Sequence, residues 1–135
     1  MVEVLAEDRF EIRDQQSLNV ALGGLRGRLL ELGLSEIMIS KLMTVSSELG
    51  GNVLKYAVSG TLFLKHVRKA GKFGLEISVQ DEGPGIPDVE QALQDHFSSQ
   101  GTLGLGLPGV RRMVDEFELT SNVGEGTRVD ATVWL

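Results

Sequence analysis

Cysteine is absent from this sequence of 135 residues. Its absence excludes disulfides, thiolate nucleophiles and thiolate metal sites, and it favours an intracellular location. The first residues, "MVEVLAEDRFEIRD", lack the basic start and apolar stretch of a signal peptide. No apolar run approaches the roughly 20 residues that a membrane span requires. We therefore expect a cytoplasmic protein that does not associate with a membrane.

Positive charge is also scarce, since 13 Lys and Arg residues stand against 19 Asp and Glu residues, a formal net charge of −6. Nucleic acids and anionic membranes both favour a basic partner surface, so neither is expected to bind this chain. Aromatic residues make up only 5% of the sequence. The length suits one domain, residues 1–135, that buries a core without metals or disulfides.

Glycine, in contrast, is plentiful, and "GLGLPG" at residues 104–109 has the spelling of a dinucleotide-binding fingerprint. That fingerprint must follow a strand, but the preceding "DHFSSQGTL" is polar and does not alternate. The spelling of a P-loop does not occur either. Glycines that lead into a helix still expose backbone N–H groups at its positive end, which favours an anion site. The alternative is a flexible surface loop.

The pattern of apolar residues predicts an α+β chain in which strands follow one another without intervening helices. One or two strands are expected in 2–13, helices in 15–32 and 35–57, and strands in "TLFLKHV" and "GKFGLEISVQ". A short helix is expected in 88–94, then a helix entered at Pro108 with Val110, Met113, Val114 and Phe117 along one side, and a terminal β-hairpin. This order predicts a two-layer α/β sandwich with helices on one face of a mixed, mostly antiparallel sheet.

The second helix carries "SSELGGNVLKYA", in which Glu48 and Asn52 are four residues apart and share a face. We expect this face to lie opposite the apolar stripe that includes Leu42, Leu49 and Val53. The simpler interpretation is an ordinary solvated helix face. Gly50 and Gly51 each cost roughly 1 kcal/mol relative to Ala inside a helix. That cost suggests that something approaches the backbone closely, or that the helix packs loosely.

The stretch "QDEGPGIPD" places Asp81 at the end of a strand, before a turn built from Gly83, Pro84 and Gly85. It is explained equally by an ordinary turn and by a ligand site. A carboxylate beside bare backbone can accept a hydrogen bond from a ligand amine such as that of adenine. Such a bond to a charged group contributes about 1.5–3 kcal/mol and rejects ligands without the donor.

Taken in order, these segments resemble one family. Glu-x-x-x-Asn on a helix, Asp-x-Gly-x-Gly, Gly-x-Gly before a helix, and "GEGT" in a terminal hairpin are similar to the GHKL ATP-binding superfamily with the Bergerat fold. This superfamily includes gyrase B, Hsp90, histidine kinase catalytic domains and anti-sigma kinases. The segments at 81–88, 106–117 and 124–127 most resemble the switch serine/threonine kinases of the stressosome pathway (RsbT type).

The resemblance implies a role for each matching residue. Glu48 would take the hydroxyl proton or orient the nucleophile, and Asn52 would ligate Mg²⁺ through its side-chain oxygen. Asp81 would hold adenine and Thr127 would support it or bond the base, while Lys55 reaches a phosphate or is simply an exposed lysine. The other residues expected to contact the nucleotide are Gly83, Gly85 and Ile86 beside the base and Gly104, Leu105, Gly106 and Leu107 in a lid over the phosphates.

The resemblance also implies an activity and partners. The chain would be an ATP-dependent protein serine/threonine kinase that modifies Ser or Thr on STAS-domain antagonist proteins and then, once released, activates a downstream phosphatase. The alternative is an anti-sigma-factor-like binding module in which ATP only sets the conformation. The segment between Asp95 and Arg111 contains no Arg or Lys, so charge compensation for phosphates falls on Lys55, Arg111 or the metal.

Overall fold

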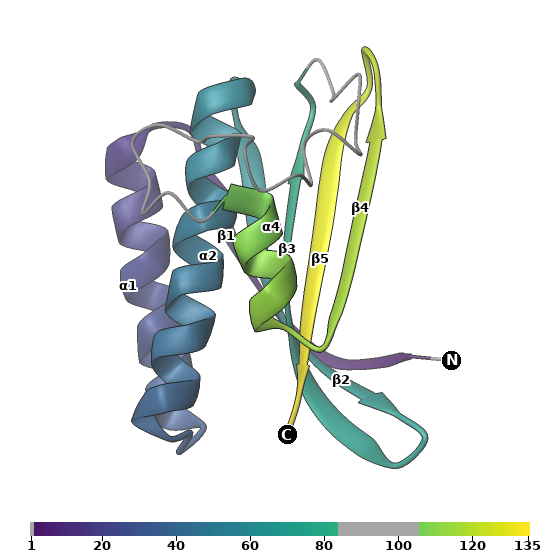
Figure 1. The fold of residues 1–135 in the computed structure, drawn as a ribbon. Coiled ribbons are helices and arrows are strands. Elements are labelled where there is room, and N and C mark those ends of the chain that lie inside the picture. Colours follow the sequence, from purple (N-terminus) through teal and green to yellow (C-terminus); the bar gives the residue numbers. More distant parts are fainter. Residues whose placement is uncertain (1, 84–105) are drawn as a thin grey trace.

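The computed structural model describes residues 2–83 and 106–135 and shows an α+β arrangement of two layers (Figure 1). The elements are β1 (Glu3–Ile12), α1 (Gln15–Glu31), α2 (Glu36–Tyr56), β2 (Gly60–Lys69), β3 (Lys72–Asp81), α4 (Gly106–Met113), β4 (Glu116–Asn122) and β5 (Gly126–Trp134). The predicted order of helices and strands is confirmed. The helix expected in 88–94 lies outside the described residues.

The five strands form one sheet in the order β1-β2-β3-β5-β4. Every strand pair in the described part of the chain is antiparallel, so the sheet there is not mixed. The β2–β3 hairpin closes at the Lys69–Lys72 pair, where Ala70 (φ 52°) and Gly71 (φ 78°) both adopt positive φ. A two-residue turn with two positive φ angles matches the twist of the flanking strands. The strand order places β3 at the centre of the sheet.

Local sequence signals set the starts of the two long helices. Asp14 caps α1 by accepting the N–H of Ser17, and the Ser17 hydroxyl accepts the N–H of Asp14 in return. Ser35 caps α2 by accepting the N–H of Met38, as its position before Glu36 predicts. Gly33, with φ 71°, ends the first helical segment.

The core lies between the helices and one face of the sheet. Both long helices turn a leucine-rich stripe toward it, and α4 adds Leu107 and Val110. The sheet contributes inward residues from three neighbouring strands, namely Leu62, Leu64, Leu75, Ile77, Val79, Val129, Ala131 and Val133. In the described part of the chain the helices cover only this face of the sheet (Figure 1). The opposite face carries polar side chains such as Lys65, Glu76 and Asp130.

The N-terminal segment forms one strand, which agrees with the expectation of one or two, and its register against β2 shifts between Val4 and Ala6. One helix boundary differs from the sequence-based expectation. The third described helix ends at Met113, so Phe117 belongs to β4. The chain turns there because Asp115 is bound to β5: its N–H donates to Thr132 O, and its carboxylate accepts the N–H of Trp134.

Candidate functional site

Asp81 ends the central strand β3, and its carboxylate is fixed by two backbone donors. The N–H groups of Gly83 (2.8 Å) and Thr127 (3.2 Å) both donate to Oδ1. No hydrogen bond reaches Oδ2 from the residues that the structure describes. The carboxylate is therefore oriented by its own backbone and keeps one oxygen for a ligand donor.

The β4–β5 hairpin supplies the second of these donors through a close approach at Gly126. This glycine has φ 109°, and a Cβ at its position would collide with the carbonyl oxygen of Asp81. The Thr127 hydroxyl lies 3.0 Å from the Ser121 hydroxyl, so the described contact from Thr127 to Asp81 is its N–H. Gly126 was not among the predicted site residues. The "GEGT" segment, whose first and third residues are glycines, was the available signal.

Gly83 connects the end of β3 to the end of α2. A Cβ at Gly83 would lie 2.8 Å from Ala57 Cβ and 3.0 Å from Tyr56 O, so only glycine fits there. This packing brings the Asp81 turn against the C-terminal end of α2. The predicted proximity of these two segments is therefore observed.

Glu48, Asn52 and Lys55 form a polar row along the C-terminal half of α2. The expectation that this face lies opposite the apolar stripe is wrong for Glu48, which is 1% exposed, and the alternative of an ordinary solvated face does not hold for it either. Positions 48 and 52 each precede a buried position, 49 and 53, and are therefore next to the apolar stripe around the helix. They lie at the border of the core. The row thus lies between core and surface, with Glu48 buried and Asn52 and Lys55 partly buried.

Two atoms of this polar row lack hydrogen-bond partners. Asn52 Oδ1 and Lys55 Nζ are inaccessible to solvent, and neither is bonded within residues 2–83 and 106–135. An unsatisfied buried polar group costs about 1–3 kcal/mol, and a charged group costs more. Burial lowers the pKa of Lys55, while the nearby Glu48 carboxylate opposes this shift. A phosphate oxygen would relieve the penalty at Lys55, whereas Asn52 Oδ1, an acceptor, would need a hydrogen-bond donor or a cation.

Gly50 has an internal explanation. A Cβ at this position would lie 2.5 Å from Leu18 Cδ1 and 3.5 Å from Ile12 Cδ1. The glycine therefore allows α1 and α2 to approach closely. The sequence left open a close approach to the backbone or loose packing of the helix. At Gly50 the close approach is correct, and the group that approaches is the core residue Leu18.

The start of α4 provides part of the predicted lid region. Gly106 is buried with φ 59°, and the side chain of Leu107 is packed in the core at 7% exposure. Only the backbone of Leu107 therefore remains for a ligand. The predicted site residues Gly85, Ile86, Gly104 and Leu105 lie outside the described residues.

The chemistry of this region suits a ligand with both a hydrogen-bond donor and an anionic end. Asp81 offers an acceptor at one end, and Lys55 and Asn52 offer a cation and a neutral oxygen along α2. Within the described residues no three His, Asp or Glu side chains are grouped as metal ligands. A divalent cation here would need oxygens from its ligand as well as from Asn52.

A family comparison identifies this arrangement. Residues 38–135 match the model for histidine kinase-, DNA gyrase B- and HSP90-like ATPases. The chain belongs to this ATPase family. The matched segment contains the polar row of α2, the Asp81 turn and the "GEGT" hairpin, which are the elements that carried the resemblance in the sequence.

Individual members of the family narrow the assignment. The chain is 46% identical over 105 residues to the serine/threonine-protein kinase RsbT of Bacillus subtilis, covering 78% of this chain and 79% of that one. It is 38% identical over 64 residues to the anti-sigma F factor of Caldanaerobacter subterraneus, covering 45% of each. The prediction of an ATPase-family serine/threonine kinase of the RsbT type is confirmed.

A solved structure shows the same fold. The crystal structure of the SiaB-SiaC complex from Pseudomonas aeruginosa contains a chain that matches 98% of this one, with a TM-score of 0.60 and 14% identity. The match covers 91% of that chain. In the described residues no helix combines the length and apolar character needed to cross a bilayer.

Proposed function

We propose that this chain transfers the γ-phosphoryl group of ATP to a Ser or Thr hydroxyl of a STAS-domain antagonist protein. Membership of the ATPase family and similarity to a serine/threonine-protein kinase over most of both chains support this activity. The observation that carries the proposal is the pairing of a fixed Asp81 carboxylate with buried, unsatisfied Asn52 and Lys55 atoms.

Each residue has a separate task in the proposed reaction. Asp81 accepts the amino group of adenine on its remaining oxygen and so selects adenine over guanine. Lys55 pairs with a phosphate oxygen, which satisfies its buried ammonium group. Backbone N–H groups at the start of α4 face the phosphates at the positive end of the helix. Phosphoryl transfer requires mainly this positioning and charge compensation.

Asn52 is the residue that fits Mg²⁺. Its buried Oδ1 has no partner in the described residues, and a neutral amide oxygen is a hard donor suited to this ion. When bound, Mg²⁺ neutralises charge on the phosphate oxygens. No carboxylate cluster surrounds Asn52 in the described residues, so the remaining ligands would come from the nucleotide and water.

In the proposed reaction Glu48 accepts the proton of the acceptor hydroxyl. The hydroxyl oxygen forms a bond to the γ-phosphorus, and the bond from that phosphorus to the β–γ bridging oxygen breaks to leave ADP. The hydroxyl proton passes to the Glu48 carboxylate.

Phosphorylation would also end the interaction with the substrate protein. A phosphoserine or phosphothreonine adds a charge of about −1.5 to −2 at neutral pH. This chain carries a formal net charge of −6, so the modified partner is repelled. The released kinase then binds and activates a downstream phosphatase, which makes the chain a partner-switching regulator of a stress response in the cytoplasm.

A radiolabel transfer assay tests the proposal. The chain is incubated with Mg·[γ-³²P]ATP and a STAS-domain antagonist, beside the same antagonist with its acceptor Ser or Thr changed to Ala. Label is expected only on the unmodified acceptor. Glu48→Gln is expected to abolish labelling while ATP binding persists, and Glu36→Gln in the first turn of the same helix is the control. Full transfer by Glu48→Gln removes Glu48 from the mechanism.

A binding module in which ATP only sets the conformation is the second candidate. The similarity to anti-sigma F factors over 45% of the chain favours it. The same assay separates the two, because a binding module leaves every antagonist unlabelled while Mg·ATP still raises its thermal stability. A ligand at 100 times its Kd stabilises by about 2.7 kcal/mol.

A further inference from the structure

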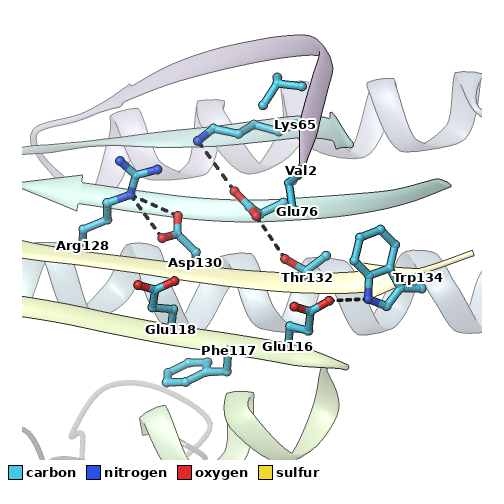
Figure 2. Close-up of a pocket in the computed structure, with 11 residues that line it drawn as sticks. Val2, Lys65, Glu76, Glu116, Phe117, Glu118, Arg128, Asp130, Thr132 and Trp134 are labelled. Atoms are coloured by element: carbon cyan, nitrogen blue, oxygen red, sulfur yellow. Dashed lines mark hydrogen bonds and ion pairs between the residues drawn. The ribbon is translucent and has the colours of Figure 1, made fainter. Parts of the chain in front are cut away.

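The sheet face opposite α2 contains a hollow of about 370 Å³ that the proposed kinase reaction does not use. It is lined by Val2, Val4, Lys65, Glu76, Glu116, Phe117, Glu118, Arg128, Asp130, Thr132 and Trp134 (Figure 2). Its volume is near the lower limit of the roughly 300–1,000 Å³ typical of small-molecule pockets. The hollow therefore suits side chains of a partner protein better than a whole cofactor.

Trp134 forms a fixed aromatic wall of this hollow. Its ring lies directly on Gly74, where a Cβ would come within 2.6 Å of Trp134 Cε3. The indole N–H donates to Glu116 Oε2 at 2.6 Å (Figure 2). Glycine beneath the ring and a carboxylate at its edge hold the indole in one orientation. A preorganised aromatic ring beside a carboxylate is suited to a cationic side chain.

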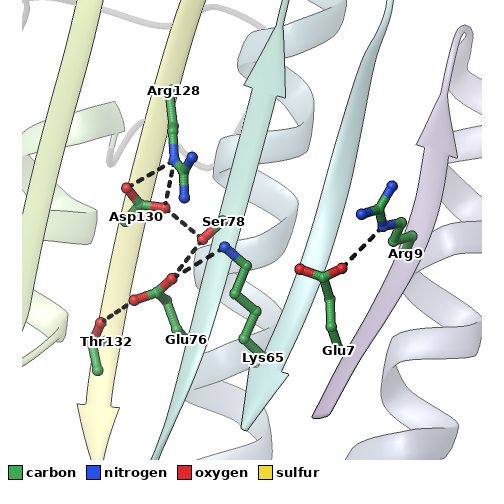
Figure 3. Close-up of polar contacts among 8 residues, drawn as sticks. All are labelled: Glu7, Arg9, Lys65, Glu76, Ser78, Arg128, Asp130 and Thr132. Atoms are coloured by element: carbon green, nitrogen blue, oxygen red, sulfur yellow. Dashed lines mark hydrogen bonds and ion pairs between the residues drawn. The ribbon is translucent and has the colours of Figure 1, made fainter. Parts of the chain in front are cut away.

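The floor of the hollow is an internally satisfied polar network. The Ser78 hydroxyl, which has one proton, lies within hydrogen-bond distance of both Glu76 Oε1 (3.0 Å) and Asp130 Oδ1 (2.6 Å), and Thr132 donates to Glu76 Oε2 (3.1 Å) (Figure 3). Lys65 lies 3.6 Å from Glu76, and Arg128 lies 3.2 Å from Asp130. Both cations of the hollow are thus paired with carboxylates of the floor.

The uncompensated charge of the hollow lies on β4. Its lining contains four carboxylates, on Glu76, Glu116, Glu118 and Asp130, against the two cations Lys65 and Arg128. Glu116 and Glu118 are exposed, and Glu118 has no ion pair or hydrogen bond in the described part of the chain. Among the strands that the structure describes, β4 is also an edge of the sheet, beside β5 alone. An exposed edge strand accepts an extended chain as an additional strand.

We propose that this hollow docks an extended basic segment of a protein partner, with an arginine or lysine seated over Trp134 and against Glu116 and Glu118. The acidic excess supplies charge complementarity, the edge of β4 accepts extended backbone, and the fixed indole receives the cation. The edge of β4 carries the backbone of the docked segment, and its basic side chains lie on the sheet face opposite the polar row of α2. A partner can therefore remain bound here while the nucleotide site is in use.

Trp134 is the single tryptophan of the sequence, so its fluorescence reports directly on the hollow. The probe is a short peptide in which arginine and threonine alternate, titrated into the full chain at low ionic strength. Emission from Trp134 is expected to change saturably on binding, and added salt is expected to weaken the binding. A peptide of alternating glutamate and threonine is expected to leave the emission unchanged.

Charge reversal separates specific docking from general attraction to an acidic protein. Glu118→Lys is expected to weaken binding of a labelled arginine–threonine peptide by at least about tenfold, measured by fluorescence anisotropy. Glu31→Lys changes the net charge equally at the exposed end of α1 and is expected to leave the affinity unchanged. Trp134→Leu is expected to weaken binding of the same peptide. The thermal stability of this variant is recorded in parallel to show that it remains folded.

The proposal is overturned if the arginine–threonine peptide does not bind, or if it binds without a change in Trp134 emission. Equal losses of affinity in Glu118→Lys and Glu31→Lys would likewise show that only net charge matters. If light scattering shows that Glu118→Lys instead dissociates a dimer of this chain, the hollow is occupied by a second copy and the proposed partner is wrong. ATP binding serves as the folding check because the nucleotide site lies on the other face.

Discussion

The backbone N–H of Thr127 donates to the carboxylate of Asp81 across 46 positions of sequence. The bond joins the C-terminal hairpin to the end of the central strand, and it acts on the same oxygen that accepts the N–H of Gly83. The orientation of Asp81 is thus set by backbone from two separate segments. A carboxylate held in this way is preorganised for a ligand donor before the ligand arrives.

Changing Asp81→Asn is expected to weaken binding of Mg·ATP by roughly ten- to a hundredfold, because a charged acceptor for the adenine amine is lost. Isothermal titration calorimetry of the folded variant measures this change. The control is Asp8→Asn, which alters a carboxylate of β1 that is paired with Arg28 of α1, and this variant should bind ATP normally. Unchanged affinity in Asp81→Asn would show that this residue does not hold the base.

The Gly126→Ala substitution is expected to lower both the free energy of unfolding and the ATP affinity. The new Cβ would collide with the Asp81 carbonyl at a positive φ, a strain of about 1–3 kcal/mol. Gly124→Ala is a matched control in the same turn, since Gly124 also has positive φ (83°) but no atoms lie within 4 Å of its Cβ position. Denaturation and calorimetry should show that Gly124→Ala loses some stability but no affinity.

Lys55→Met is expected to make the nucleotide-free protein at least as stable as the wild type while weakening ATP binding. Burial lowers the pKa of Lys55 from 10.5, so its charged form is disfavoured in the folded state. The wild type therefore carries this penalty below the folded-state pKa, and the penalty is relieved as pH rises from there through 10.5. The stability advantage of Lys55→Met should shrink over that interval.

Thermal unfolding at several pH values, with and without Mg·ATP, measures this trade between stability and binding. Lys41→Met, a change at a partly buried lysine nearer the start of α2, is the control. A Lys55→Met variant that binds ATP as tightly as the wild type would show that the buried ammonium group does not meet the phosphates.

Gly50→Ala is expected to destabilise the fold by about 1–3 kcal/mol, because its Cβ would overlap Leu18 and force α1 away from α2. Gly23→Ala offers the opposite case, since no atom lies within 4 Å of that Cβ position on the exposed side of α1. That substitution should raise the free energy of unfolding by about 0.4–1 kcal/mol, because alanine reduces the conformational entropy of the unfolded chain. Chemical denaturation compares the two, and stabilisation by both would contradict the packing explanation.

The sequence by itself determined the order of elements and their main boundaries. Apolar spacing, the Ser35 cap and the glycines at 33 and 71 are local signals, and each acts within a few residues of where it stands. The motifs around Asn52, Asp81 and Thr127 likewise identified the family, because their order along the chain is specific even though each motif alone is weak.

Tertiary structure alone decided how the site residues are buried and held. Glu48 was expected on an open helix face, but it is buried because its position borders the core stripe, and helical periodicity does not define how wide that stripe is. The contact of Leu18 with Gly50 and the bond from Thr127 to Asp81 each join residues more than thirty positions apart. Such contacts depend on how helices and strands pack, which local patterns do not encode.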